Sequence, residues 1–292
     1  MNKQINVLLV GGTSFLGQHI LQQLKICSDL RVQFTSRQQT MEPSIYLDLS
    51  LENDYLTLFE RFHFDIVLWV SAIKDVQWCE NNKALAKKIN HDSLLRCYEQ
   101  LHQIEKFPKF IFISSDYVFD GVTGHYTVAS AKNPGTYYGQ LKSLSEAFLL
   151  EQKQQDVIVR TSSLCGKESV FLTWLVTQLQ ESKEVSLFDN SYLTPTSVTY
   201  FSKVLQDLIF ELNSKTLNNK ILHICGDQRY SRIEFALAVK AAFSSVLKAD
   251  VKGEHAVGHL GQDVSLVSSY LGQQKPHTIS HLMDEVKECI KL

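Results

Sequence analysis

The sequence lacks the features that mark membrane, secreted and nucleic-acid-binding proteins. No stretch approaches the roughly 20 apolar residues of a membrane-spanning helix, so no membrane partner is expected. The opening residues MNKQINVLLVGG carry no signal-peptide pattern, because their apolar run is short and leads directly into a glycine turn. The formal net charge is only −2 and the basic residues form no block, which argues against nucleic acid as a partner.

Cysteine and proline are also sparse. The six cysteines are widely scattered and include no CxxC pair, so we expect neither a metal site nor a redox site. Free thiols in a reducing compartment are the simplest interpretation, which predicts a cytoplasmic protein. With five prolines in 292 residues, no obvious linker divides the chain.

The sequence does contain a regular alternation of apolar and amphipathic segments. At 44% apolar and 21% charged residues, the chain can bury a sizeable core. The alternation is typical of an α/β protein with a Rossmann-type, doubly wound parallel sheet. Short apolar runs predict strands at residues 5–10, 31–36, 44–49, 65–72, 110–115 and 157–162. Amphipathic runs predict helices at residues 15–26, 51–62 and 81–104, and a further helix that contains Tyr138.

Beyond about residue 165 the alternation loosens. We predict a dinucleotide-binding Rossmann domain at residues 1–165. Residues 166–292 are then expected to form a smaller C-terminal lobe that mainly binds substrate, with segments that return to the main domain. The elements predicted there are helices near 170–182, 197–213, 231–243 and 277–291 and a strand at 221–226.

A glycine turn joins the first strand to the first helix in the segment GGTSFLG (11–17). Such a turn lets backbone N–H groups and a helix N-terminus approach a pyrophosphate. Gly11 can take the tight turn, and Gly17 lets the helix pack closely on the sheet, whereas Ser14 stands where a glycine is usual. The turn predicts a dinucleotide site, and a glycine-rich turn without a ligand is the alternative.

The end of the second strand indicates which dinucleotide is bound. A carboxylate there would bind the 2′-hydroxyl of NAD, but the sequence has Thr35-Ser36-Arg37. An arginine can pair with a 2′-phosphate, which favours NADP and leaves NAD as the alternative. A solvated arginine at a strand end is the other interpretation. Asp48 and Leu49, after the third strand, are expected beside the adenine.

Tyr138 and Lys142 are four residues apart, which places them on one face of a helix. An ammonium group beside a phenol favours the phenolate, so we expect Lys142 to lower the pKa of Tyr138. Such a tyrosine can exchange a proton at neutral pH, as carbonyl reduction or alcohol oxidation requires. A solvated Tyr–Lys contact, which chance alone can supply, is the alternative.

Several longer motifs carry a resemblance to one family. They are the turn GGTSFLG, SSDYVFDG (114–121), YGQLKSLSE (138–146), VRTSSLCG (159–166), LTPTS (193–197), LHICGDQRYSRIEFA (222–236) and DVSLVSSYLG (263–272). With these motifs the chain resembles the extended short-chain dehydrogenase/reductases, specifically the dTDP-4-dehydrorhamnose reductase family. The resemblance implies an NADPH-dependent reductase of a 4-keto nucleotide-sugar, with a homodimer as a possible assembly.

The resemblance also implies roles for individual residues. Ser115 would hydrogen-bond the substrate carbonyl, with Ser114 as a neighbour that could share this role. Tyr138 would donate the proton, and Lys142 would hold the nicotinamide ribose. The expected cofactor-binding residues are Gly11, Gly12, Thr13, Ser14, Phe15, Leu16, Gly17, Arg37, Asp48, Leu49, Ser71, Ala72, Tyr138 and Lys142.

The chain departs from the family pattern where the nucleotide-sugar would bind. Ser163 stands where the family often has a tryptophan, Trp69 where an asparagine is common, and His259-Leu260-Gly261 where an Arg-Pro pair is usual. A different sugar or a different role would account for these changes. The alternative role is that of an NADP-binding regulatory subunit without catalysis, resembling the methionine adenosyltransferase beta subunit. An epimerase with bound NAD is a third reading, against which Arg37 argues.

Overall fold

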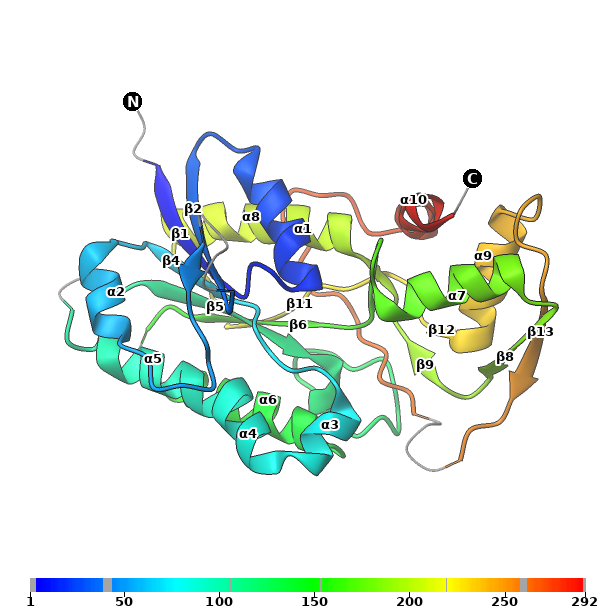
Figure 1. The fold of residues 1–292 in the computed structure, drawn as a ribbon, viewed down its shortest axis with the longest axis horizontal. Helices are drawn as coiled ribbons and strands as arrows, with labels where there is room; N and C mark the ends of the chain where they lie inside the picture. The colour runs from blue at the N-terminus through cyan, green and yellow to red at the C-terminus, as the bar shows by residue number, and fades with distance from the viewer. Residues whose placement is uncertain are drawn as a thin grey trace. The chain divides into compact units, whose positions relative to one another are not determined.

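A seven-stranded sheet lies at the centre of the N-terminal part of the molecule (Figure 1). The computed structural model describes residues 4–38, 44–104, 107–152, 154–218, 220–257 and 262–290. The strand order is β11-β6-β5-β4-β1-β2-β3. The strands are β1 (Ile5–Val10), β2 (Leu30–Ser36), β3 (Ile45–Tyr46), β4 (Ile66–Trp69), β5 (Lys109–Ser115), β6 (Val157–Thr161) and β11 (Ile221–His223). The predicted doubly wound α/β class is confirmed.

The central strands are almost completely buried, which explains their continuous apolar sequence. In β4 all four residues are buried, and Leu68 pairs with Leu9 of β1 in parallel register. Strand β1 lies between β4 and β2, so the chain order of the sheet reverses beside it. Ligands of such sheets bind outside the carboxyl ends of the strands at this reversal.

Helices cover both faces of the sheet. Figure 1 shows α1 and α8 on one face and α4, α5 and α6 on the other. The helices of this part are α1 (Phe15–Lys25), α2 (Tyr55–Arg61), α3 (Val76–Asn81), α4 (Lys83–Lys87), α5 (Ser93–Leu101), α6 (Tyr137–Glu151) and α8 (Val198–Ser214).

The predicted helix at 81–104 corresponds to a continuous helical run over residues 83–101, made of α4, a π-helical turn and α5. Helix α3 ends at Asn81, and Asn82, with a non-helical φ of −129° and ψ of 47°, separates it from α4. Between α4 and α5 the chain makes one π-helical turn at Lys88–Asp92, which buries Asn90 and His91. Such a turn inserts one extra residue per turn and often lies at a functional site.

The chain divides into two compact units. One comprises Met1–Val118, Pro134–Val159 and Leu205–Leu222, and the other comprises Phe119–Asn133, Arg160–Val204 and His223–Leu292. The predicted boundary at residue 165 stays a prediction.

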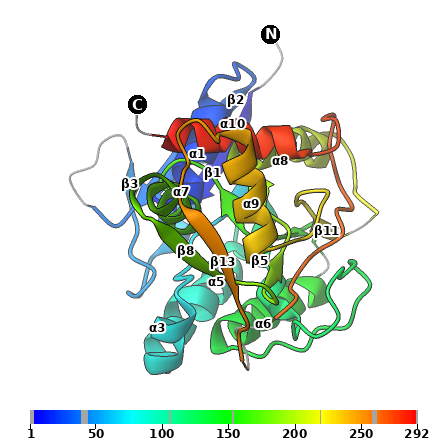
Figure 2. The same cartoon turned by 90° about the vertical axis from the view of Figure 1, so that its right-hand side faces the viewer.

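The second unit contains helices and short paired strands. Figure 2 shows α7 and α9 beside the strand pair β8–β13. Apolar residues of these elements, such as Leu175, Val185 and Phe235, form one buried cluster. The helices are α7 (Val170–Glu181), α9 (Arg232–Ala242) and α10 (Ile279–Cys289). The strand pairs are β7 (Leu164–Cys165) with β10 (Thr196–Ser197), β8 (Glu184–Phe188) with β13 (Asp250–Glu254), and β9 (Tyr192–Leu193) with β12 (Tyr230–Ser231).

Three further findings concern the described residues. Within the described ranges no helix has the length and apolarity to cross a bilayer. The same ranges contain no group of three or more His, Cys, Asp and Glu side chains arranged to hold a metal ion. All six cysteines lie in these ranges and are free thiols, as expected from their spacing.

Candidate functional site

The glycine turn after β1 is closed so tightly that two of its glycines are sterically required. Gly11 has a φ of +96°, and its N–H donates to Thr35 Oγ1 at 2.9 Å. A Cβ on Gly17 would lie 2.1 Å from the carbonyl oxygen of Gly11. The backbone of the turn therefore touches the first turn of α1 directly. This close approach, with the N-terminus of α1 beside it, fits the pyrophosphate of a dinucleotide.

Ser14 has a structural explanation at the position where a glycine is usual. It is the N-cap of α1, and its Oγ accepts from Gly17 N at 3.1 Å. The same hydroxyl donates to Gly11 O at 2.8 Å, so one side chain holds both ends of the turn. Its φ of −72° is ordinary for a residue with a side chain, so no glycine is needed here.

The remaining predicted turn residues also lie at the start of α1. Gly12 is buried against Phe34, which a Cβ on Gly12 would meet at 2.6 Å. Thr13, Phe15 and Leu16 are half-buried, so each presents part of its surface to solvent.

Arg37 and Asp48 lie close enough to interact at the ends of β2 and β3. Arg37 is exposed. The hydroxyl of Ser50 donates to Asp48 Oδ1 at 2.7 Å, and this bond is the main cause of the lowered pKa of Asp48. The positive charges of Arg37 and Lys88 lower that pKa further. Two basic side chains, Arg37 and Lys88, therefore lie near the carboxylate of Asp48.

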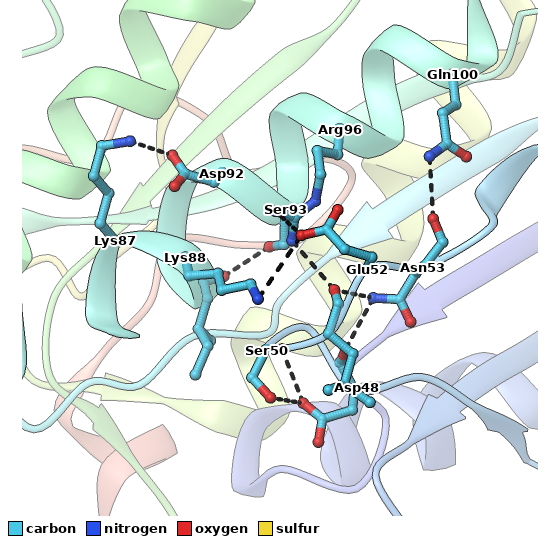
Figure 3. A network of polar contacts seen from close by, with 12 residues as sticks. Asp48, Ser50, Glu52, Asn53, Lys87, Lys88, Asp92, Ser93, Arg96 and Gln100 are labelled. Atoms are coloured by element: carbon cyan, nitrogen blue, oxygen red, sulfur yellow. Dashed lines mark hydrogen bonds and ion pairs between the residues drawn. The ribbon is translucent and has the colours of Figure 1, made fainter. Parts of the chain in front are cut away.

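The segment that follows Asp48 is fastened to α5 (Figure 3). Asn53 Nδ2 donates to Asp48 O at 2.8 Å, and Gln100 Nε2 donates to Asn53 O at 3.1 Å. Glu52 pairs with Arg96 at 3.2 Å and with Lys88 at 3.8 Å. These contacts fix the loop on which Asp48 stands.

Leu49, Ser71 and Ala72 differ in what they offer a ligand. Leu49 is 5% exposed and lies in the hydrophobic core, so its side chain offers almost no surface to a ligand. Ser71 N donates to Val10 O at 3.1 Å, and its Cα lies 2.9 Å from where a Cβ of Gly11 would stand. Ala72 packs in the cluster that contains Tyr138. The end of β4 thus joins the glycine turn to helix α6.

Helix α6 brings Tyr138 and Lys142 together in a buried position. Its N-cap, Thr136, accepts from Gly139 N at 3.1 Å. A Cβ on Gly139 would lie 2.0 Å from Tyr117 O, so the start of α6 rests on the backbone after β5. Tyr138 is 7% exposed and Lys142 is 2% exposed. The Lys142 Nζ lies 5.9 Å from the centre of the Tyr138 ring.

Ser115 meets Tyr138, while Ser114 points to a different partner. Ser115 Oγ donates to Asp116 Oδ1 at 2.7 Å, and the Ser115 side chain is close enough to Tyr138 to affect the pKa of its phenol. Ser114 Oγ donates to the buried Glu146 at 2.6 Å. Neighbouring residues of a strand alternate in direction, so the two serines do not share one role.

The expectation that Lys142 lowers the pKa of Tyr138 is wrong for this arrangement. Burial raises the pKa of Tyr138, and the nearby Asp116 carboxylate raises it further, against a smaller effect of the Ser115 hydrogen bond. Burial also lowers the pKa of Lys142 to about 8, although the Glu146 carboxylate opposes this change. The phenol therefore holds its proton at neutral pH and is suited to donate it.

Asn90 and Glu146 are two residues of the site that sequence reasoning missed. The Asn90 side chain accepts from Ile73 N at 2.8 Å and donates to Ile73 O at 2.9 Å, which fixes the chain after β4. Nothing in the sequence reveals Asn90, because its position depends on the π turn. The sequence did contain a signal for Glu146, because this residue follows Tyr138 and Lys142 at successive intervals of four residues on one helix face.

The departures from the family pattern have partly structural explanations. Trp69 is 1% exposed and lies in the hydrophobic core beside the sheet. The carbonyl of Ser163 accepts from Thr196 N at 2.9 Å, beside the β7–β10 pair. His259, Leu260 and Gly261 lie outside the described residues.

A known family matches this fold and this set of residues. The family model described as the RmlD substrate binding domain matches residues 5–257. The chain belongs to this family. The sequence-based assignment to dTDP-4-dehydrorhamnose reductase-like proteins is thereby confirmed.

Members and structural neighbours of this family have different named roles. A probable low-salt glycan biosynthesis reductase of Haloferax volcanii is 26% identical over 64% of this chain, and the match spans 65% of that relative's length. The methionine adenosyltransferase 2 subunit beta of Bos taurus is 24% identical over 82% of this chain and 72% of that protein. The structure of Bacillus anthracis dTDP-4-dehydrorhamnose reductase in complex with NADP aligns with a TM-score of 0.83. It is 20% identical, and the alignment covers 98% of this chain and 99% of that one.

Proposed function

We propose that the protein is an NADPH-dependent reductase of a 4-keto nucleotide-sugar. The observation that carries the proposal is the buried Tyr138 phenol, which contacts Ser115 and lies on the same helix face as Lys142. A protonated phenol beside a hydroxyl is what carbonyl reduction needs where charge develops on oxygen. Membership of the family, a relative named as a reductase and a neighbour with NADP support the same proposal.

The proposed mechanism assigns roles to three side chains. NADPH, when bound, supplies a hydride to the carbonyl carbon. Ser115 and Tyr138 donate hydrogen bonds to the carbonyl oxygen as it becomes negative, and Tyr138 then gives it a proton. Lys142 would hold the ribose hydroxyls of the cofactor through the donors of its ammonium group.

The choice of NADPH rests on the ends of β2 and β3. Arg37 is exposed and close enough to Asp48 to affect its pKa. A guanidinium group in this place pairs with a 2′-phosphate, whereas NAD recognition uses a carboxylate for the 2′-hydroxyl. Arg37 is therefore proposed as the phosphate-binding residue, with Asp48 and Leu49 beside the adenine.

A regulatory subunit is the second candidate function. The match to methionine adenosyltransferase 2 subunit beta covers more of this chain than the match to the haloarchaeal reductase does. A regulator would bind NADP and a partner enzyme but would not turn over a sugar. Buried Ser115, Tyr138 and Lys142 favour the reductase, because a binding protein has no need of all three.

The experiment that separates the candidates is a screen of 4-keto nucleotide-sugars for NADPH oxidation, followed at 340 nm. Substrates with dTDP, UDP, GDP and CDP are tested, and NADPH binding is measured separately by fluorescence. Turnover with one substrate supports the reductase. NADPH binding without turnover, together with binding to a methionine adenosyltransferase catalytic subunit, would contradict the reductase proposal and support the regulatory subunit.

A further inference from the structure

The Lys142 ammonium group is enclosed in a site that does not favour charge. Its side chain is 2% exposed, and Nζ donates to the carbonyl oxygen of Ile113 at 2.8 Å. Nζ also lies 4.5 Å from the centre of the Phe112 ring. A carbonyl and an aromatic face stabilise a cation only partly. Burial consequently lowers the pKa of Lys142 to about 8.

A carboxylate lies one helical turn further along α6. Glu146 is 0% exposed, and Ser114 Oγ donates to its Oε1 at 2.6 Å. A buried carboxylate is costly unless a cation or several donors accompany it. Lys142 is four residues earlier on the same face, and the charge of Glu146 raises the pKa of Lys142 against the effect of burial.

The other titratable groups around this part of α6 have different partners. Asp116, after β5, accepts from Ser115 and acts on the pKa of Tyr138. Glu80 of α3 accepts from Tyr137 N at 2.7 Å and pairs with Lys83 at 3.5 Å.

Two neighbours of α6 favour their neutral forms. Burial raises the pKa of the Cys79 thiol, which belongs to α3. Burial lowers the pKa of His91 in the π turn. The two buried carboxylates in this region act on different groups. Asp116 affects the pKa of Tyr138, and Glu146 affects the pKa of Lys142.

We propose that Glu146 is a positioning residue that acts through Lys142, as the buried counter-ion that keeps this side chain an ammonium. Through Ser114 it also ties the end of β5 to α6, the two elements that carry Ser115 and Tyr138. The catalytic consequence rests on the proposed reductase function, whereas the charge pairing does not.

The pairing is tested directly by following the protonation of Lys142. Protein labelled with ¹³C at lysine Cε is titrated by NMR, and the Lys142 signal is assigned from its loss in Lys142→Met. The wild type should titrate near pH 8. Glu146→Gln keeps an acceptor for Ser114 and removes the charge, so its midpoint should fall by at least about one pH unit. Glu151→Gln, an exposed control on the same helix, should leave the midpoint unchanged.

Several results would overturn the proposal. An unchanged midpoint in Glu146→Gln, or an equal shift in Glu151→Gln, contradicts it. If Glu146→Gln fails to fold, the ¹³Cδ chemical shift of Glu146 is measured in the wild type at pH 7. A shift typical of a carboxylate supports the proposal, and a shift typical of a protonated carboxylic acid contradicts it.

An activity profile then separates this proposal from the proposed reaction. In an active reductase the high-pH decline of kcat/KM should move to lower pH in Glu146→Gln, with at least about a fivefold loss at pH 8 relative to wild type. Glu146→Asp should restore most of the profile. A wild type that reduces no keto-sugar refutes the reductase, while the NMR titration still decides the role of Glu146.

Discussion

Lys142 in the first unit and His277 in the second are both buried ionisable groups, yet their surroundings favour opposite charge states. Lys142 has the Glu146 carboxylate one turn away. His277 is 1% exposed, and its Nε2 accepts from Ser197 N at 3.0 Å. That bond requires an unprotonated Nε2, and burial together with the nearby His281 lowers the pKa of His277 to about 4. The Glu146 carboxylate supports a charge at the first site against the effect of burial, whereas burial disfavours a charge at the second.

Two buried carboxylates, one in each unit, also differ in their partners. Glu146 lies near a cation. Glu285, in contrast, accepts from Ser197 Oγ at 2.6 Å and from Thr199 N at 3.0 Å, at the start of helix α8. A carboxylate at a helix N-terminus stabilises that end of the helix. Glu285 therefore joins α10 to α8. In these two units the partner of a buried ionisable group, and not its burial alone, decides whether the group is charged.

The largest effect is expected from Lys142→Met. The substitution leaves the Glu146 charge without its cation, which should lower the free energy of unfolding by about 3 kcal/mol and abolish measurable turnover. Urea unfolding and NADPH oxidation provide the two measurements. The double variant Lys142→Met/Glu146→Gln should regain stability but not activity, and a double variant as unstable as the single one would disprove the pairing.

Acid should destabilise the protein through His277. The unfolded chain takes up a proton near pH 6.5, whereas the folded site resists it down to about pH 4. The stabilisation is therefore complete above pH 6.5 and is lost as the pH falls toward 4, by about 3 kcal/mol in total. Urea unfolding of wild type and His277→Gln at several pH values measures this. His281→Gln should reduce the slope only in part, because it removes the smaller of the two causes of the lowered His277 pKa. An unchanged slope in His277→Gln would be contrary to the account.

Arg37→Ala tests the choice of cofactor. Loss of a charge-assisted pair with the 2′-phosphate should weaken NADPH binding about tenfold to a hundredfold and leave NADH binding almost unchanged. Fluorescence titration with both nucleotides measures the preference. Equal losses for both, or no loss for NADPH, would refute the phosphate role of Arg37.

The smallest effect concerns Ser14. Ser14→Ala removes the N-cap of α1 and should lower the free energy of unfolding by about 1 kcal/mol, whereas Ser14→Gly should cost only a few tenths. Denaturant unfolding of both variants measures the difference. A glycine variant less stable than the alanine variant would contradict the capping role.

The central strands of the main sheet were predictable because they are buried on both faces and are therefore almost continuously apolar in sequence. Strand β13 was not, because its sequence DVKGE is mostly exposed and gains its structure only by pairing with β8, about 60 residues away along the chain. The end of α3 before Asn82 and the π turn at Lys88–Asp92 were also not predicted, because apolar periodicity alone does not distinguish them from a regular helix.

In the site, spacing predicted that Tyr138 and Lys142 share a helix face, since helical geometry fixes that relation. Their pKa values were not predictable, because they depend on how deeply the helix is buried. The direction expected for Tyr138 was wrong for this reason.

The central claim is that Tyr138 donates the proton in a carbonyl reduction. The most direct measurement is single-turnover NADPH oxidation by wild type and Tyr138→Phe with the keto-sugar substrate found in the screen, alongside NADPH affinity. The account predicts that Tyr138→Phe slows the reaction by about 10² to 10⁴ and binds NADPH as the wild type does. A variant that oxidises NADPH at the wild-type rate would contradict it.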